Sequence, residues 1–353
     1  MKRHNNLFGK IVSFENVLKA TRKARKGKRY KASTARFEYD LERNVLKIID
    51  VLKNKTYKPG AYQDFYVYDP KKRLISAAPY FDRVIHHAVI NVIGPILESS
   101  FISDTYACIH GKGTHKAVQR YKEFQKKNAF VLKCDIKRYY ENIDHKILFN
   151  KLENKIKCRE TLWLLETIIN SRHSVTDPVY FPGDNLFTPL NRKKGIPIGN
   201  LTSQFFANLY LNDFDHFMKE EIKAGFYVRY CDDFVIFGNS KTWLNEVKIR
   251  IIAYLKTLRL RLHENKSRIY MTSDGVDFLG YRIYPDYLRV RKSTVKKYRK
   301  KLRGIVHGYE TGVIQLTDVR SSIHSWIGHV KHANSYALRK EMLRHVVLCK
   351  RRP

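Results

Sequence analysis

The sequence predicts an α+β fold in which a small antiparallel sheet is backed by helices. Two patterns carry this prediction: apolar residues recur at helical spacing in several segments, and short apolar runs rich in β-branched and aromatic residues lie between turn residues. The chain has 353 residues, of which 43% are hydrophobic and 13% aromatic, so it can bury a sizeable core. Disorder is excluded as its main description.

The elements follow in chain order. Helical spacing marks residues 39–52, 82–97 and 205–219. Strand patterns mark residues 63–69, 73–77, 130–135, 227–237 (a strand pair) and 276–283. The first two strands flank Asp69-Pro70-Lys71-Lys72, which predicts a hairpin with a positive tip. Between Val290 and Val306 apolar residues recur every three or four positions among Lys and Arg, as in an amphipathic helix that packs one face and offers the other to a phosphate backbone.

The charge of the chain is strongly positive. It holds 68 Lys and Arg against 33 Asp and Glu, a formal net charge of +35. Residues 1–31 carry 11 basic residues and one acid, and residues 286–353 carry 17 and four. A field of this size favours a polyanionic partner, the alternative being a merely basic, ribosomal-type protein. Residues 21–31 could instead be an ordinary solvated tail that binds no partner.

The cysteines and the apolar runs set the expected compartment. Five cysteines lie far apart without a CxxC pair, which favours a reducing compartment and gives no zinc or disulfide framework. No apolar run is long enough for a membrane span, and the N-terminus lacks a secretory pattern. We therefore expect a cytoplasmic protein with no membrane partner.

Three acidic residues stand in contexts that favour metal chemistry. Tyr230-Cys231-Asp232-Asp233 joins two β-rich runs, and Asp135 ends another apolar strand. For Asp232 and Asp233 the alternative is an ordinary Asp-Asp turn without a metal. If the strands are neighbours, the three carboxylates converge and can hold two divalent cations about 3.5–4 Å apart for phosphoryl transfer. Ligation by oxygen alone favours Mg²⁺, with Mn²⁺ as a possible substitute, over zinc.

A glycine-punctuated loop, GIPIGNLTSQ at residues 195–204, precedes the third predicted helix. Gly199 permits close backbone approach, and Asn200, Thr202 or Ser203 can cap the helix. Taken alone, the loop is also consistent with an ordinary capped helix start.

In this order and spacing the motifs resemble those of reverse transcriptases. The matching strings are Asp135 with Tyr140 five residues on, GIPIGNLTSQ, YCDD, HENKS at residues 263–267, FLGY at residues 278–281, and Lys71 to Arg73 with FDRVIHHA at residues 81–88. The resemblance covers about residues 60–345 and implies a right-hand polymerase with fingers, a ferredoxin-like antiparallel palm and a helical thumb. Its implied parts are a basic N-terminal extension (1–31), fingers (32–130 and 146–194), palm (131–145 and 195–285) and a basic helical thumb (286–353).

The resemblance also implies roles for individual residues. The metal site would comprise Asp135, Ile136, Asp232 and Asp233, and Lys266 would protonate the leaving pyrophosphate. Arg73, with Lys71 or Lys72, would bind the triphosphate. The other implied substrate residues are Ile136, Tyr140, Ile198, Gly199 and Gln204, with the Tyr140 ring excluding a 2′-hydroxyl. Phe278, Leu279, Gly280 and Tyr281 would form the primer grip.

The second motif narrows the resemblance. Its IGxxxSQ form, the FDRVIHHAV segment and the segment 326–334 resemble enzymes of diversity-generating retroelements, although Cys231 departs from the usual Met or Ala. Membership would imply that the enzyme extends a primer with deoxynucleotides on a template-repeat RNA and makes errors opposite template adenines. It would also imply a small basic oligomeric accessory protein as partner. It would also imply a bacterial, archaeal or phage-encoded enzyme. The Ile198 side chain cannot hydrogen-bond near the templating base pair as an amide can, and this would loosen the selection of the correctly paired nucleotide.

Two alternatives stay open. One is a group II intron-type, retron-type or phage-defence reverse transcriptase. The other is a non-catalytic, maturase-like RNA-binding protein, against which the retained and mutually repelling Asp135, Asp232 and Asp233 argue.

Overall fold

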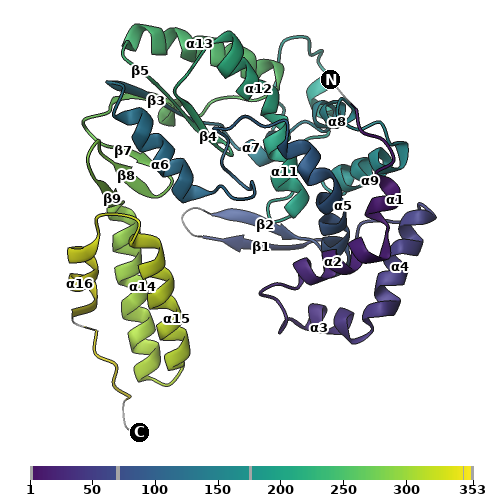
Figure 1. Ribbon diagram of the computed structural model, residues 1–353, viewed down its shortest axis with the longest axis horizontal. Coiled ribbons are helices and arrows are strands. Elements are labelled where there is room, and N and C mark those ends of the chain that lie inside the picture. Colours follow the sequence, from purple (N-terminus) through teal and green to yellow (C-terminus); the bar gives the residue numbers. More distant parts are fainter. Residues whose placement is uncertain (1–2, 69–71, 175–176, 345, 351–353) are drawn as a thin grey trace.

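The computed structural model describes residues 3–68, 72–174, 177–344 and 346–350. Figure 1 shows three parts, which we call the helical lobe, the sheet region and the C-terminal bundle. The α+β class predicted from the sequence is confirmed, because helices surround three antiparallel sheets. Among the described residues, no helix is both long and apolar enough to cross a membrane.

The helical lobe is built around α5 (Tyr80–Glu98), an apolar helix that is buried along most of its length. α2 (Phe14–Ala24) packs on it through Val17 and Ala20, while its basic residues lie on the other face. Since Thr21 and Ala24 are buried as well, the start of segment 21–31 is no solvated tail. The remaining elements of the lobe are α1 (Phe8–Ile11), α3 (Ala32–Tyr39), α4 (Leu41–Lys53), α8 (His145–Glu153), α9 (Arg159–Asn170), α10 (Thr188–Asn191) and the hairpin of β1 (Gln63–Val67) and β2 (Arg73–Ala77).

The main sheet has the strand order β4-β5-β3-β6 and is antiparallel throughout. Its strands are β3 (Phe130–Asp135), β4 (Tyr227–Tyr230), β5 (Asp233–Gly238) and β6 (Arg268–Met271). Side chains alternate between its faces. Leu132 and Cys134 join the large core with α11 (Leu201–Tyr210) and α13 (Lys241–Thr257), whereas Val131 joins a second core under α6 (Thr114–Gln125).

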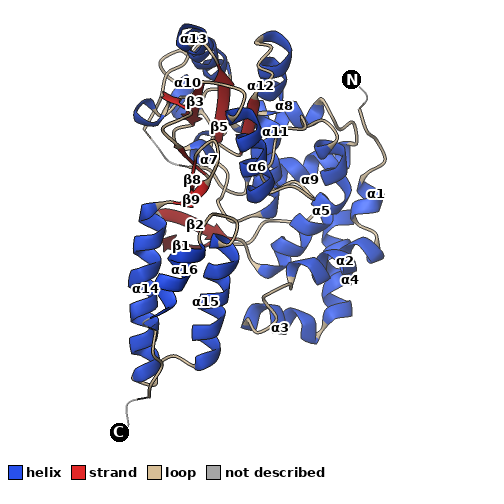
Figure 2. Ribbon diagram, turned by 60° about the vertical axis from the view of Figure 1, so that its left-hand side comes forward, coloured by secondary structure: helices blue, strands red, loops and turns tan. Residues whose placement is uncertain are grey.

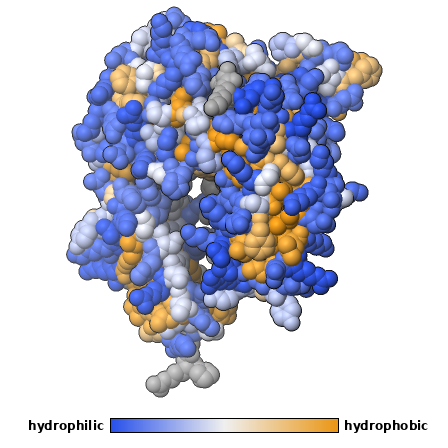
Figure 3. Space-filling model, turned by 45° about the vertical axis from the view of Figure 1, so that its right-hand side comes forward, coloured by the Kyte–Doolittle hydropathy of each residue, from blue (hydrophilic) through white to orange (hydrophobic). Residues whose placement is uncertain are grey.

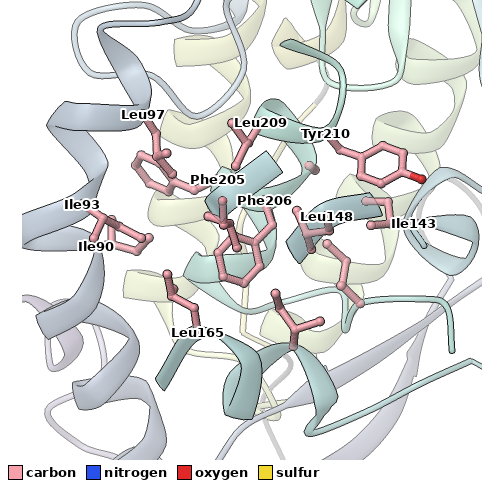
Figure 4. Packing of buried hydrophobic residues seen from close by; sticks show 14 of the residues in the cluster. Ile90, Ile93, Leu97, Ile143, Leu148, Leu165, Phe205, Phe206, Leu209 and Tyr210 are labelled. Carbon is pink, nitrogen blue, oxygen red and sulfur yellow. The ribbon is translucent and has the colours of Figure 1, made fainter. Parts of the chain in front are cut away.

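The large core joins the sheet region to the helical lobe. Figure 4 shows Phe205, Phe206 and Leu209 of α11 between Ile90, Ile93 and Leu97 of α5 on one side and Leu148 of α8 on the other, with Leu165 of α9 below them. The two helices are in close contact at Gly94, since a Cβ built there would lie 3.4 Å from the Phe205 ring, at van der Waals distance. The loop before α11 is thus anchored to a rigid core.

Two predicted elements are divided in the structure. The predicted helix 205–219 is α11, α12 (Asn212–His216) and a π-helical turn (Phe217–Glu221), because Leu211 leaves the helical region with ψ at 4°. The predicted strand 276–283 is the hairpin of β7 (Val276–Phe278) and β8 (Tyr281–Ile283), since Leu279 and Gly280 turn the chain with φ of 47° and 92°. β9 (Leu288–Val290) completes this second sheet.

The C-terminal bundle consists of α14 (Lys292–Glu310), α15 (Leu316–Val330) and α16 (Tyr336–Arg344). It has a core of its own, in which Trp326 stacks on Tyr298 with ring centroids 4.5 Å apart. Figure 2 shows the bundle as a separate column of helices below the strands. The predicted amphipathic helix between Val290 and Val306 is therefore confirmed as α14. Its residues Tyr298 and Leu302 face that core.

Candidate active site

The strands bring the predicted carboxylates to one end of the main sheet. Asp135 and Asp233 are register partners on β3 and β5, so their side chains lie on the same face, with Cβ atoms about 4.5–5.5 Å apart. Asp232 lies in the two-residue turn between β4 and β5. The Ile136 N–H donates to the Asp232 carbonyl at 3.3 Å, which ties the end of β3 to this turn.

Burial and mutual repulsion shape the electrostatics of this site. Burial raises the pKa of Asp233 to about 6, opposed by the charge of Lys133 and reinforced by Asp232 and Asp135. Burial also raises the pKa of Asp232, and Asp135 adds to that rise while Arg73 opposes it. The carboxylates therefore interact with one another and favour a compensating cation.

Two lysines supply part of that compensation. Lys266, in a 3₁₀ turn (Glu264–Lys266), forms an ion pair with Asp135. Lys133 points to the same face as Asp135, two residues earlier on β3, and its Nζ donates to the Asp277 carbonyl at 2.7 Å. Burial lowers the pKa of Lys133, an effect that Asp233 opposes.

The donor chemistry fits a hard divalent cation, since the three acids offer only oxygen. However, among the described residues no group of three or more His, Cys, Asp and Glu side chains is gathered closely enough to hold a metal ion. The predicted convergence of all three carboxylates on one point is therefore only partly seen. Like charges repel, and the ammonium group of Lys266 neutralises Asp135 in this arrangement.

The turn that carries Asp232 is held from beneath by residues that the sequence analysis missed. Cys231 adopts φ of 57°, a left-handed conformation that costs a residue with a Cβ roughly 1–2 kcal/mol. Arg229 donates from Nη1 to the Cys231 carbonyl at 3.1 Å and binds both oxygens of Asp215 at 2.6 and 2.7 Å. Both Arg229 and Asp215 are fully buried. The available signal was a cation inside the apolar run of residues 226–237.

Tyr140 lies beside the same turn. Its hydroxyl is 3.4 Å from the Cys231 sulfur, and burial raises the pKa of this phenol. The side chain is half-buried, and its hydroxyl lies next to the turn that carries Asp232.

The loop 195–204 packs against the β1–β2 hairpin. Ser76 of β2 donates its N–H to the Ile198 carbonyl at 3.1 Å. Gly199 has φ of 122°, and a Cβ there would lie 3.2 Å from the Ile75 side chain, so this close approach requires glycine. Asn200 occupies the N-cap position but its side chain accepts no capping bond, and its Nδ2 donates to the Tyr62 hydroxyl at 3.0 Å. The predicted side-chain cap is wrong for Asn200, and Thr202 and Ser203 lie buried within α11.

The predicted triphosphate residues lie on the hairpin. Arg73 is exposed on β2 and close enough to act electrostatically on Asp232. Lys72 is exposed and its Nζ lies 4.3 Å from the centroid of the Tyr66 ring. The third candidate, Lys71, falls outside the described residues. Gln204 is half-buried on the first turn of α11.

The predicted primer grip is only partly available to a ligand. Phe278 and Tyr281 are fully buried in the second core, and the Tyr281 hydroxyl donates to the His329 carbonyl at 2.9 Å. These two rings are therefore not accessible in this structure. Leu279 and Gly280 form the half-exposed tip of the turn.

Comparison with known proteins decides the family. The family described as "Reverse transcriptase (RNA-dependent DNA polymerase)" matches residues 58–283, more than half of the chain. The chain belongs to the reverse transcriptase family. This match is to the family of the predicted enzyme, RNA-directed DNA polymerase, and it spans the carboxylates, the loop 195–204 and the β1–β2 hairpin of this reverse transcriptase.

Curated relatives resemble this reverse transcriptase at low identity. Protein YkfC of Escherichia coli is 24% identical over 259 residues, which cover 62% of this chain and 65% of that protein. The group II intron-encoded protein LtrA of Lactococcus lactis is 24% identical over 347 residues, covering 78% of this chain and 55% of LtrA. The chain thus spans less than two thirds of either relative. Among solved structures, apo telomerase from Candida tropicalis, truncated from its C-terminal domain, matches with a TM-score of 0.49 and 14% identity over 70% of this chain and 60% of that chain.

Proposed function

We propose that this reverse transcriptase copies an RNA template into cDNA by two-metal-ion nucleotidyl transfer. The observation that carries the proposal is the placement of Asp135 opposite Asp233, with Asp232 in the adjoining turn. Mg²⁺ ions held by Asp135, Asp232 and Asp233, with Ile136 beside them, would stabilise the attacking and leaving oxygens of the displacement. Mn²⁺ would be a possible substitute.

The other residues would bind and orient the reactants. Arg73 and Lys72 would receive the triphosphate on the face of the hairpin toward Asp232, as guanidinium and ammonium groups suit phosphate oxygens. The Tyr140 ring would stand against the sugar of the incoming nucleotide and exclude a 2′-hydroxyl. Ile198, Gly199 and Gln204 would contact the base pair and template, and Lys266 would give its proton to the leaving pyrophosphate once released from Asp135.

The same proposal assigns the parts of the molecule. The helical lobe would be the fingers, the sheet region the palm, and the C-terminal bundle the thumb. Because α2 packs on α5, we assign residues 3–31 to the fingers as well. The template and primer would lie in the gap between the bundle and the helical lobe that is visible in Figure 3.

A primer-extension assay tests the proposal. With an RNA template, an annealed DNA primer, dNTPs and Mg²⁺, the wild-type chain is expected to extend the primer, and Asp232→Asn to lower the rate by about 10³-fold or more. Asp274→Asn, an exposed acid in the turn before β7, is the matched control and should retain the wild-type rate. Equally poor extension by wild type and Asp232→Asn would favour the maturase-like RNA-binding protein.

We further propose that the enzyme belongs to a diversity-generating retroelement. Support comes from the IGxxxSQ loop, the FDRVIHHAV segment of α5 and the segment 326–334. The substrate would then be a template-repeat RNA, and a small basic oligomeric protein would assist. A group II intron-type enzyme is the second candidate, which the match to LtrA over 78% of this chain favours. A neighbouring pair of near-repeats that differ only at adenines would decide for the first, and a flanking structured intron for the second.

The identity of residue 198 is expected to set fidelity at template adenines. Ile198→Gln introduces an amide that can hydrogen-bond near the templating pair and penalise poor geometry, so misincorporation opposite adenine should fall roughly tenfold. Sequencing of cDNA from one defined RNA template measures this rate. Ile198→Leu keeps the apolar character and serves as the control. An adenine error rate that Ile198→Gln leaves unchanged would contradict this role of Ile198.

A further inference from the structure

The positive charge of the C-terminal bundle is unevenly placed. α14 carries seven Lys and Arg against one Glu, whereas α15 carries one Arg and one Asp. In both Figure 1 and Figure 2, α15 is the helix of the bundle nearest the helical lobe, and α14 lies farther away. Most of the charge therefore lies away from the gap in which the template and primer are proposed to bind.

A groove of about 1160 Å³ runs between α14 and the start of α16. Its apolar floor includes Val295 and Leu338, and its lining contains basic side chains but no carboxylate. This combination of lining groups favours a ligand that is strongly anionic along its length.

The cations along α14 are regularly spaced. Lys292, Lys296, Lys300 and Arg303 all line the groove and are exposed. No ion pair seen among the described residues involves any of these four. Their spacing of four, four and three residues places them on one helix face over about 16 Å. At about 3.4 Å of duplex length per phosphate on one strand, that distance matches about five phosphates.

A second feature, next to the groove, distinguishes a nucleic-acid ligand from an acidic peptide. Between β8 and β9, the rings of Tyr284 and Tyr287 stack with centroids 4.4 Å apart. The guanidinium of Arg289 lies 4.9 Å from the Tyr287 centroid, and Arg289 also lines the groove. Arginine with aromatic rings beside a basic track is the pattern by which proteins bind bases together with their backbone.

We propose that the α14–α16 groove and the Tyr284–Tyr287 stack form a second nucleic-acid-binding surface, outside the gap between the bundle and the helical lobe. It would hold the phosphodiester backbone of a segment that is not being copied. This surface goes beyond the proposed polymerase function and needs neither dNTPs nor catalysis.

Binding of a labelled hairpin tests the surface. Fluorescence anisotropy of the full chain with a 20-base-pair RNA hairpin, and with a DNA hairpin of the same sequence, gives Kd against KCl concentration without dNTPs. In the groove variant K292Q/K296Q/K300Q/R303Q the log-log salt slope is expected to fall by about 3–4, and affinity at 0.15 M salt by more than about tenfold. The hairpin that shows the larger loss identifies RNA or DNA as the ligand.

Matched variants keep this test specific. R43Q/K47Q/K53Q/K58Q removes the same charge from exposed positions in and just after α4, far from the bundle in Figure 1, and should change the slope by less than about one. K292R/K296R/K300R keeps the charge and should bind as wild type does. Ultraviolet crosslinks from the bound hairpin should appear at Tyr284 or Tyr287. Equal slope losses in the Gln variants of the groove and of α4 would overturn the proposal, as would displacement of the hairpin by polyglutamate at equal charge concentration.

Discussion

Replacing Arg229 by methionine is expected to lower the free energy of unfolding by about 3–5 kcal/mol. The change leaves the carboxylate of Asp215 fully buried without its cation, and the hydroxyls of Tyr227 and Thr105 that also bind Asp215 cannot replace that charge. It also removes the donor to the Cys231 carbonyl, so the turn that carries Asp232 loses its support. Denaturant unfolding measures the first effect. Primer extension at a temperature at which the variant is folded measures the second, and the rate should fall by about tenfold or more.

An exposed ion pair provides the control for this prediction. Arg43 pairs with Asp40 at 3.7 Å with its side chain 85% exposed, so Arg43→Met should cost less than about 1 kcal/mol. Arg229→Met/Asp215→Leu should recover part of the stability, because no unpaired charge stays buried, but it should not recover the extension rate. A folded Arg229→Met enzyme with the wild-type rate would show that the Arg229 contact does not position the turn.

Asp233→Asn is expected to make the protein more stable in the absence of divalent metal ions. The folded state holds the pKa of Asp233 at about 6 against an ordinary value of 3.8, so keeping this group ionised in the folded protein is unfavourable. The asparagine side chain has nearly the same shape and no charge. At pH 7.5 in EDTA, thermal unfolding should show a gain of about 2 kcal/mol over wild type.

The stability gain of Asp233→Asn is expected to depend on pH. Between about pH 3.8 and pH 6 the folded wild-type protein binds more protons at Asp233 than the unfolded chain does, so its stability falls as pH rises through that window. The stability difference between Asp233→Asn and wild type should therefore be small near pH 4 and complete above pH 6. Addition of Mg²⁺ at pH 7.5 should stabilise wild type more than the variant. A variant less stable than wild type at pH 7.5 in EDTA would mean that the contact with Lys133 outweighs burial and repulsion.

Much of the fold could be predicted from local pattern. The apolar run of residues 130–135 gave the bounds of β3, and Asp69 to Lys72 marked the hairpin of β1 and β2. Helix ends inside apolar segments were not predicted. The apolar periodicity continues through Leu211, although α11 ends before that residue. The hairpin within residues 276–283 was also missed, although Gly280 is a turn residue at its centre.

The sequence predicted the acidic residues of the candidate site, but it did not predict the buried residues that hold their turn in place. Asp135, Asp232 and Asp233 could be found because acids at the ends of apolar strands are unusual. Asp215 and Arg229 are 14 positions apart, and only the packing of α12 beneath β4 and β5 joins them. Similarly, the motif containing Phe278 and Tyr281 gave no sign that their rings are buried, since burial depends on α6 and on the second core.

Manganese binding tests the central claim, that Asp135, Asp232 and Asp233 hold the metal ions at which a DNA end meets its next nucleotide. Electron paramagnetic resonance can count bound Mn²⁺ in the complex of the full chain with an RNA template, a dideoxy-terminated DNA primer and the next dNTP. Wild type and Asp274→Asn are predicted to bind two Mn²⁺ per chain, and Asp135→Asn and Asp232→Asn one or none. If Asp135→Asn/Asp232→Asn binds as many Mn²⁺ ions as wild type in this complex, these carboxylates are not the metal ligands and the account is contradicted.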